Sequence, residues 1–240
     1  MMWIFIIVAV VFAYLLGLLD PEAWLNASGN LSRFLSELYI REDLLGDALY
    51  AVGDTFVMAL FATVVGFLIS FHIAVMSVRE ITPRPVALAF RAVANVIRTV
   101  PAIFWGILFV IMFGPGRESG ALALVLYTTG YLSKFFYETL ENVGKEHYEA
   151  LQSMGLSWLI LGKALFKHTE KQNIANIMFM LEYNLRTASI LGIVGAGGVG
   201  YYIIQYVNIL DYAAAFTFFV VILVFVFALD GLSHLVRKRF

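Results

Sequence analysis

Long runs of apolar residues alternate with shorter polar stretches along the whole chain. Because about 20 apolar residues in a helix cross about 30 Å of hydrocarbon, the long runs are candidate membrane spans. They cover Met1–Leu19, Val52–Met76, Val86–Phe113, Gly120–Tyr137, Ile174–Val194 and Tyr212–Val236. The pattern predicts an all-α membrane protein with about six transmembrane helices. An outer-membrane barrel would show alternating segments of about 10 residues instead.

Two of these segments contain polar residues that a lipid-facing helix would avoid. The fourth is diluted by Thr128, Thr129, Gly130 and Lys134. The third contains Arg91 and Arg98, so its first half is not expected to face lipid. Pro101 follows soon after Arg98, and its missing N–H predicts a kink in this segment.

Composition supports a membrane protein and excludes several other classes. Hydrophobic residues make up 61% of the 240 residues and charged residues 14%, whereas about a quarter of residues are charged in soluble domains. This composition excludes a soluble enzyme, a disordered chain and a nucleic-acid binder. The net charge of −1 also argues against a polyanionic partner. The chain has no cysteine, which excludes disulfides and thiol metal sites.

Lysine and arginine residues predict the orientation of the helices in the membrane. With the N-terminus in the cytoplasm, the outer segments carry only Arg33, Arg41 and Arg117 among the basic residues. The inner segments carry most of the others, and the basic run at 237–239 places the C-terminus inside as well. We therefore expect a multi-pass protein with both termini in the cytoplasm.

The chain is expected to have two parts. Residues 1–47 form a first transmembrane helix and an external amphipathic segment, Asp20–Asp47, that lies on the membrane surface. Residues 48–240 form the core, with a long cytoplasmic loop at about 138–173.

A glycine-rich segment matches the letters of a dinucleotide-binding motif, with Gly195, Gly197, Gly198 and Gly200. That motif needs a preceding strand and an acidic residue about 20 positions further on. Here a membrane span precedes it, and Asp211 comes too early. We interpret the segment as a tightly packed or flexible turn at the outer end of the fifth span, where glycine permits a positive φ and close approach. The four histidines are scattered and predict no metal site.

The cytoplasmic loop contains two short amphipathic stretches. Ala150, Leu151 and Met154 share one helical face, and an apolar stripe resumes at Leu156. Gly155 separates the stretches, which predicts two short helices joined at that glycine. Such a helix either lies on lipid or enters the groove of a partner protein.

The loop resembles the E-A-A-x-x-x-G loop of ABC-importer permeases at Glu149, Ala150 and Gly155. Leu151 replaces the second alanine, and the Leu-Pro that often ends the family's loop is missing. Three further blocks, in order around this loop, are similar to the permease subunit of phosphonate ABC importers: Arg98–Ala102, Thr128–Gly130 with Lys134, and Leu191–Gly200 followed by Asp211-Tyr212. Methionine-importer permeases share a similar glycine-rich segment and are the nearest alternative.

The resemblance implies the bundle of a type I ABC-importer permease in the inner membrane of a prokaryotic cell. Two copies, or this chain and a close relative, would surround a central path through the lipid bilayer. Each copy would engage an ABC ATPase subunit through Glu149, Ala150, Leu151, Gly155 and Leu156. That ATPase would bind ATP and Mg, so no cofactor or catalytic residue is expected in this chain. A substrate-binding protein would dock on the outer loops.

Charged residues inside the spans are candidates for the path, because such residues normally face the bundle interior or water. Arg98, Glu182 and Arg186 are the clearest cases. Glu182 and Arg186 are four residues apart, so they either form a structural ion pair or mark a path that tolerates an anion. The complete set of predicted path or gating residues is Arg98, Thr99, Pro101, Thr128, Thr129, Lys134, Glu182 and Arg186. An intramembrane enzyme that uses Glu182, Arg186 or a histidine is the third alternative.

Overall fold

The computed structural model describes the backbone of residues 1–239 and their side chains other than those of Val236, Arg237 and Arg239. Two basic residues of the predicted inner C-terminus, Arg237 and Arg239, thus have side chains outside the described set. The chain divides into two compact units, Met1–Ile40 and Arg41–Phe240. The division comes slightly before the boundary at residue 48 that the sequence suggests.

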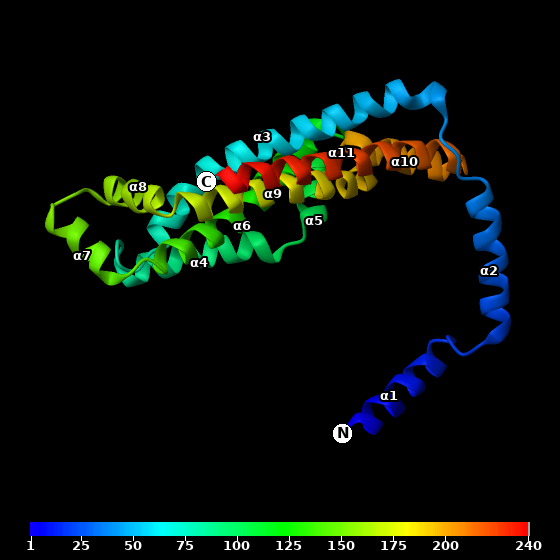
Figure 1. Ribbon diagram of the computed structural model, residues 1–240, viewed down its shortest axis with the longest axis horizontal. Helices are drawn as coiled ribbons and strands as arrows, with labels where there is room; N and C mark the ends of the chain where they lie inside the picture. The colour runs from blue at the N-terminus through cyan, green and yellow to red at the C-terminus, as the bar shows by residue number, and fades with distance from the viewer. Residues whose placement is uncertain (240) are drawn as a thin grey trace. The chain divides into compact units, whose positions relative to one another are not determined.

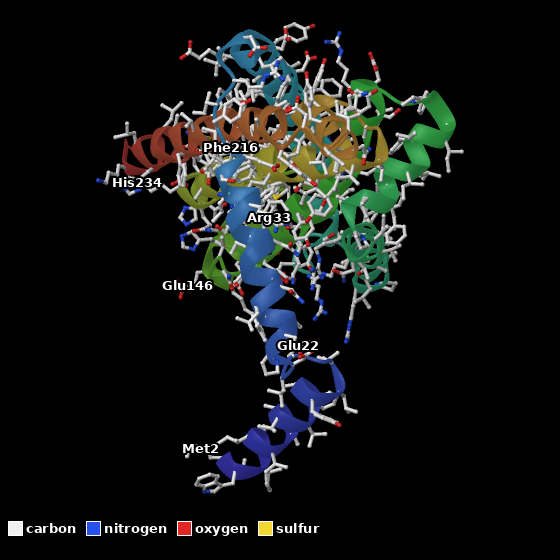
Figure 2. The ribbon with its side chains drawn as sticks, turned by 90° about the vertical axis from the view of Figure 1, so that its right-hand side faces the viewer. Met2, Glu22, Arg33, Glu146, Phe216 and His234 are labelled. Carbon is white, nitrogen blue, oxygen red and sulfur yellow. The ribbon has the colours of Figure 1, made fainter. Side chains whose placement is uncertain are left out.

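The first unit consists of two helices that bury none of their residues, α1 (Met2–Leu15) and α2 (Pro21–Ser36). Asp20 begins α2 as its N-cap, because its carboxylate accepts a hydrogen bond from the Glu22 N–H at 3.0 Å. Pro21 occupies the first turn, where a missing N–H costs nothing. Side chains project on all sides of both helices (Figure 2). A helix therefore does form in the predicted external segment.

The second unit is an elongated bundle of helices (Figure 1). The short 3-10 turn η1 (Glu42–Leu44) leads into α3 (Leu45–Ser77), and the 3-10 turn η2 (Gly192–Val194) follows α9. The helices after α3 are α4 (Arg84–Thr99), α5 (Ala102–Phe113), α6 (Arg117–Glu141), α7 (Lys145–Ser153), α8 (Trp158–His168), α9 (Glu170–Leu191), α10 (Gly198–Asn208) and α11 (Tyr212–Arg239). Within this unit α7 and α8 extend from one end, and α10 lies at the opposite end.

Three described helices are long and apolar enough to cross a membrane, or four if the bent pair α4 and α5 forms one span. The three single helices are α3, α9 and α11. The remaining two expected spans are α1, which has 14 residues, and α6, which has 25 residues but carries charges at both ends. Most of α6 is enclosed by other helices, which explains why it does not need a lipid-compatible surface.

The expected third segment, Val86–Phe113, consists of two helices bent by 85°, which confirms the kink predicted at Pro101. The break lies at Val100 and Pro101, between α4 and α5. Proline at 101 cannot donate to the carbonyl of Ile97, four residues earlier. The indole Nε1 of Trp105 donates to that carbonyl at 3.3 Å instead. The predicted kink is thus a sharp bend, and the Ile97 carbonyl that it exposes has a hydrogen-bond donor in Trp105.

The centre of the bundle is α6, which packs against α3, α4, α5 and α9. Gly66 allows α3 to lie close to α6, since a Cβ there would lie 2.6 Å from Thr128 Cγ2. Beside it, the Asn184 side chain donates to Thr63 Oγ1 at 2.9 Å and to Thr128 Oγ1 at 2.8 Å. This fully buried polar cluster joins α3, α6 and α9. Small residues and interhelical hydrogen bonds hold helices together where lipid supplies no hydrophobic driving force.

Candidate functional site

The helical elbow between α7 and α8 is formed as the sequence predicts. Gly155 has φ +67°, a conformation that side chains with a Cβ rarely adopt, and a Cβ built there would meet nothing within 4 Å. Its N–H donates to the Gln152 carbonyl at 3.0 Å and ends α7. Met154 is 68% exposed and Trp158 is 44% exposed. The elbow therefore presents apolar side chains to its surroundings on a turn whose positive φ favours glycine.

Behind the turn, both helices of the elbow are anchored to the bundle. The buried Tyr148 hydroxyl of α7 donates to the Leu140 carbonyl of α6 at 2.8 Å, and burial raises the pKa of this hydroxyl well above its usual value. Gln152 Nε2 donates to the Glu80 carbonyl at 2.6 Å. In α8, Gly162 lies so close to α3 that a Cβ would be 2.6 Å from Val75 Cγ1. A force on the turn would thus reach α6 and α3 directly.

The predicted coupling residues lie on α7 and in the turn between α7 and α8. Glu149 and Ala150 are exposed on α7, and Leu151 is half-buried on the same helix. Leu156 is half-buried just after Gly155. Leu151 and Leu156 both pack against the main core cluster, so they tie the exposed surface to the bundle interior.

Arg98 lies at the mid-bundle break, where the end of α4 crosses α6. A Cβ on Gly130 would be 2.9 Å from the Arg98 backbone nitrogen, so only glycine allows this crossing. The Arg98 guanidinium carbon lies 5.6 Å from the centre of the Tyr131 ring, within the range of a cation–π contact. Arg98 Nε is buried without a hydrogen-bond partner in the described chain. A cation with an unused donor therefore stands about halfway along α6.

The other predicted path residues near this crossing have different surroundings. Lys134 is one turn beyond Gly130, and its Nζ lies 3.4 Å from Glu138 Oε1. Thr129 Oγ1 is buried and lacks a partner among the described side chains. Thr128 is fully buried in the cluster with Asn184, which gives it a structural contact with no access to a surface. Thr99 and Pro101 are exposed at the break itself.

Glu182 and Arg186 lie on α9 and are not brought to Arg98. Glu182 is 5% exposed, whereas the Arg186 residue is exposed. The described ion pairs do not join these two side chains. One ion pair that the sequence did not predict joins Arg91 of α4 to Glu141 of α6. Arg91 Nε also donates to the last carbonyl of α3, that of Ser77, at 2.8 Å. It joins three helices at the elbow end of the bundle.

A row of aromatic rings runs along the shared surface of α6 and α9. Tyr127 and Tyr131 have ring centres 4.7 Å apart, and both stack on Tyr183. The row continues through Phe135 to Phe179, with ring centres 6.0 Å apart. The i, i+4 spacing of these aromatics in each helix is the signal that sequence analysis could have used.

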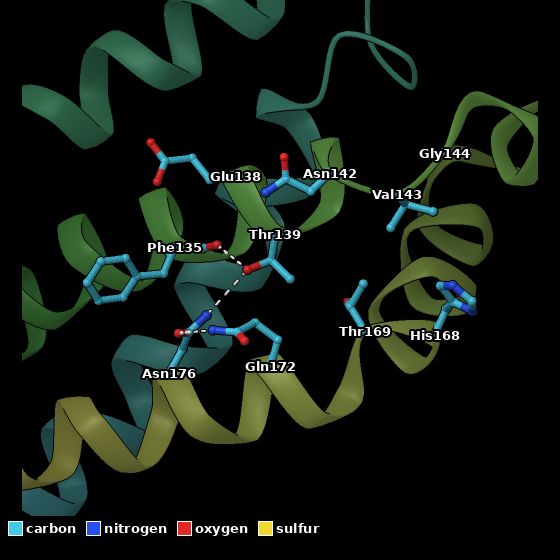
Figure 3. A pocket seen from close by; sticks show the side chains of 10 residues that line it. All are labelled: Phe135, Glu138, Thr139, Asn142, Val143, Gly144, His168, Thr169, Gln172 and Asn176. Carbon is cyan, nitrogen blue, oxygen red and sulfur yellow. Dashed lines mark hydrogen bonds between the residues drawn. The ribbon is translucent and has the colours of Figure 1, made fainter.

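Where the aromatic row ends, a polar cavity of about 600 Å³ opens between the end of α6 and the beginning of α9. Figure 3 shows a hydrogen-bonded chain within it. Gln172 Nε2 donates to Asn176 Oδ1 at 3.2 Å, and Asn176 Nδ2 donates to Thr139 Oγ1 at 3.4 Å. Neutral amides and hydroxyls supply most of the polar lining, and Glu138 and His168 also face the cavity. Such a lining suits a hydrated polar solute better than an apolar one.

The glycine-rich segment forms a tight turn at the end of the bundle opposite the elbow. Gly195, Gly197 and Gly198 have positive φ. A Cβ on Gly197 would lie 2.7 Å from the Arg117 nitrogen, and one on Gly200 would lie 1.7 Å from the Ser189 carbonyl oxygen. Thr55 Oγ1 accepts from the Val199 N–H at 2.8 Å. Packing against α3 and α6 therefore requires these glycines, and no strand precedes them for nucleotide binding.

Two of the histidines are less scattered than the sequence suggests. His147 of α7 and His168 of α8 have ring centres 4.6 Å apart. No group of three or more candidate metal ligands occurs among the described residues. The pair therefore has the character of a packing contact between the two helices of the elbow.

Comparison with known proteins adds a family match over most of the bundle. Residues 81–240 match the family described as the inner membrane component of binding-protein-dependent transport systems. The phosphite transport system permease protein PtxC of Stutzerimonas stutzeri is 30% identical over 97% of this chain and 88% of that protein. The phosphate-import permease protein PhnE of Mycolicibacterium smegmatis is 33% identical over 82% of this chain but only 38% of that protein.

Two solved structures share the fold at lower identity. The MetNI methionine ABC transporter in an inward-facing conformation has a chain with a TM-score of 0.74 and 19% identity, over 83% of this chain and 99% of that chain. An amino acid ABC transporter solved with histidines gives a TM-score of 0.63 at 19% identity, over 90% of this chain and 98% of that chain.

Proposed function

Since the chain belongs to the family of inner membrane components of binding-protein-dependent transport systems, we propose that it is the permease subunit of an ATP-driven importer for phosphonate or a related phosphorus oxyanion. The observation that carries this proposal is the match to a phosphite transport permease over almost the whole of both chains. The chain changes no bond in this scheme. Its task is to open a path to alternate sides of the membrane.

The orientation proposed here follows from the charge distribution along the bundle. The elbow end carries Lys145, Lys163, Lys167 and Lys171 on α7, α8 and the start of α9. Excess lysine and arginine favours the cytoplasmic side. The elbow and the end of α11 lie toward the same end of the bundle (Figure 1), so the C-terminus is cytoplasmic and the glycine-rich turn external. From the same distribution of lysine and arginine, we propose that the N-terminus, before α1, also lies in the cytoplasm.

The elbow at Gly155 is proposed to bind a separate ATPase subunit, which holds ATP and Mg. Its exposed surface combines Glu149 with the apolar Met154, a composition that suits a groove in a partner protein. The contacts of Tyr148 and Gly162 would pass the movement of that partner to α6 and α3. Two copies of the chain, or this chain and a close relative, would face each other around the path, and a substrate-binding protein would dock at the outer end.

Arg98 is proposed to hold the oxyanion briefly during transport. Guanidinium groups bind phosphorus oxyanions through charge-assisted hydrogen bonds. The α5 N-terminus, just past Pro101, adds unsatisfied N–H groups and a partial positive charge near the same break. Beyond Arg98, the nearby Lys134 is paired with Glu138, and neutral amides and hydroxyls supply most of the polar cavity lining, an arrangement that suits release toward the cytoplasm.

Two other functions remain as alternatives. An importer permease for an amino acid such as methionine shares the fold, but at 19% identity that likeness concerns the fold alone. An intramembrane enzyme would need turnover by the purified chain without an ATPase. Uptake into proteoliposomes tests all three, using this chain with the ATPase and binding protein encoded by neighbouring genes. ATP-dependent uptake of radiolabelled phosphonate or phosphite, without uptake of methionine, is the expected result; the reverse selectivity would refute the proposal.

Arg98→Ala should impair uptake far more than it impairs membrane insertion. Removal of one charge-assisted contact of about 1.5–3 kcal/mol predicts a decrease of about tenfold or more in the apparent affinity of the transporter for its substrate. The measurement is initial uptake rate against substrate concentration at equal protein content. Arg84→Ala, an exposed arginine at the other end of α4, is the matched control. Equal uptake by Arg98→Ala and the parent would exclude this role of Arg98.

A further inference from the structure

An apolar groove with a basic edge lies on the surface of the bundle where α3, α8 and α9 meet. One part is a cavity of about 450 Å³ whose walls include Phe67, Phe71, Phe166, Ile174 and Ile177. The Phe166 ring packs on Phe67, Phe71 and Phe136, with ring centres 5.9, 5.3 and 5.0 Å apart. The groove therefore has a rigid aromatic floor.

A second apolar cavity of about 620 Å³ adjoins the first along α3. Leu68 and His72 line both cavities and form the ridge between them. Met76 and Phe90 belong to the far wall of the second cavity, and Trp158 of the elbow closes one side. The two apolar cavities adjoin at Leu68 and His72, and together they offer apolar surface for the acyl chains of one phospholipid.

The charges at the groove lie at one edge, on or beside α8. Lys163 and Lys167 are four residues apart and therefore on one helical face. Glu170 pairs with Lys167, whereas Lys163 forms no ion pair in the described part of the chain. His72 also lines the groove, and its Nδ1 bonds to the Leu68 carbonyl at 2.9 Å. The basic edge thus carries Lys163, which has no ion pair among the described residues, and Lys167, which Glu170 partly neutralises.

The position of this edge identifies the ligand class. The α3 helix is apolar enough to cross the membrane, so the groove beside its last turns faces acyl chains. In the proposed orientation, on which this inference rests, the lysines lie at the cytoplasmic headgroup level. Basic pockets between membrane helices on that side bind anionic lipid headgroups. Tryptophan is also enriched at this level, which fits Trp158.

We propose that this groove binds one anionic phospholipid of the cytoplasmic leaflet. Its phosphate lies at Lys163 and Lys167, and its two acyl chains occupy the cavities on either side of Leu68 and His72. The same α8 helix carries the elbow, so the lipid stabilises the position from which the elbow engages its ATPase. Activity of the assembled transporter therefore depends on anionic lipid.

The first test measures the lipid that the assembled transporter retains. The complex is reconstituted in nanodiscs of equal phosphatidylglycerol and phosphatidylcholine, extracted in mild detergent and analysed by native mass spectrometry. The parent should retain phosphatidylglycerol in preference to phosphatidylcholine. In the double variant Lys163→Gln/Lys167→Gln, the amount of retained phosphatidylglycerol should decrease by about threefold or more. In Lys171→Gln, which changes an exposed lysine outside the groove, the amount should stay the same. Equal retention of the two lipids, or no loss in the double variant, would overturn the proposal.

The second test identifies what covers the groove. A photoreactive benzoylphenylalanine replaces Leu68 on the ridge and is activated in membranes. A phospholipid adduct supports the proposal, whereas an adduct with a second copy of the chain or with the ATPase overturns it. Both tests need neither substrate nor ATP. Retained phosphatidylglycerol without oxyanion uptake would therefore refute the proposed transport function and leave the lipid site standing.

Discussion

Two turns at opposite ends of the bundle each need a glycine at positive φ, but their surroundings differ. Gly155 at the elbow and Gly197 in the glycine-rich turn both have positive φ. Around Gly155 a Cβ would meet nothing within 4 Å, whereas a Cβ on Gly197 would collide with the backbone of Arg117. One turn requires glycine only for its φ, and the other requires it also for space.

This difference separates a surface that is available to a partner from a joint inside the fold. The elbow is anchored from behind by Tyr148 and Gly162, while its tip is open. The glycine-rich turn is packed between α3, α6 and α9, through contacts with Thr55, Gly120 and Ser189. A substitution in the first should alter coupling, and a substitution in the second should alter folding.

The largest effect is expected for Gly200→Ala. Its Cβ would lie 1.7 Å from the Ser189 carbonyl oxygen, a backbone atom that can move only if α9 and α10 separate. Overpacking of this kind destabilises by about 1–3 kcal/mol or more. Thermal unfolding of the detergent-solubilised protein should show a clear decrease in Tm. Gly53→Ala is the control, because Gly53 lies within α3 with nothing within 4 Å. Equal Tm values for Gly200→Ala and the parent would contradict the tight packing.

Asn184→Ala should have the next largest effect on stability. It removes the donors to Thr63 and Thr128 that join three helices in the bundle centre. Interhelical hydrogen bonds in membrane proteins contribute about 0.6–2 kcal/mol each, so the free energy of unfolding should decrease by about that amount or more. Asn176→Ala, at the open polar cavity, should decrease it less. An equal decrease in the free energy of unfolding for both variants would show that burial of the Asn184 cluster does not add to its stabilising effect.

Gly155→Val should have a smaller effect on stability and a large one on coupling. A residue with a Cβ at positive φ costs about 1–2 kcal/mol, and no neighbour adds a clash here. We expect normal membrane levels but ATP hydrolysis that no longer drives uptake, measured together in proteoliposomes. Gly155→Asn should retain most coupling, because asparagine tolerates this conformation. Normal uptake by Gly155→Val would remove the coupling role of the elbow.

Tyr148→Phe should have the smallest effect. It removes one hydrogen bond to the Leu140 carbonyl, which predicts a loss of about 0.5–1.5 kcal/mol. Burial raises the pKa of the folded Tyr148 hydroxyl above that of the unfolded chain, about 10. The parent therefore keeps this stabilisation below about pH 10 and loses it at higher pH, as the unfolded chain ionises first. Unfolding followed from pH 8 to pH 11 should show a steeper loss in the parent than in Tyr148→Phe. Parallel pH profiles would show that this hydroxyl is not the group responsible.

The sequence predicts the helices and the breaks between them, but it does not predict which side chains of distant helices contact one another. Glycine at 155 and proline at 101 act on their own backbone, so the two-helix elbow and the break after α4 were both predictable. Hydropathy alone marks Val86–Phe113 as one apolar run, and only the proline indicates that this run is bent. The ion pair of Arg91 with Glu141 was missed because its partners are far apart in the chain.

By itself the sequence determined that the chain is helical and membrane-embedded, since composition and periodicity are properties of each segment and the solvent it needs. It also determined where the chain must turn, because glycine and proline restrict φ locally. Only the tertiary structure decided that Thr128 ties helices together, that Arg98 lies at mid-bundle over Tyr131, and that Gly200 is needed for space. These outcomes depend on which atoms of distant segments come into contact, and a linear pattern holds no information on those distances.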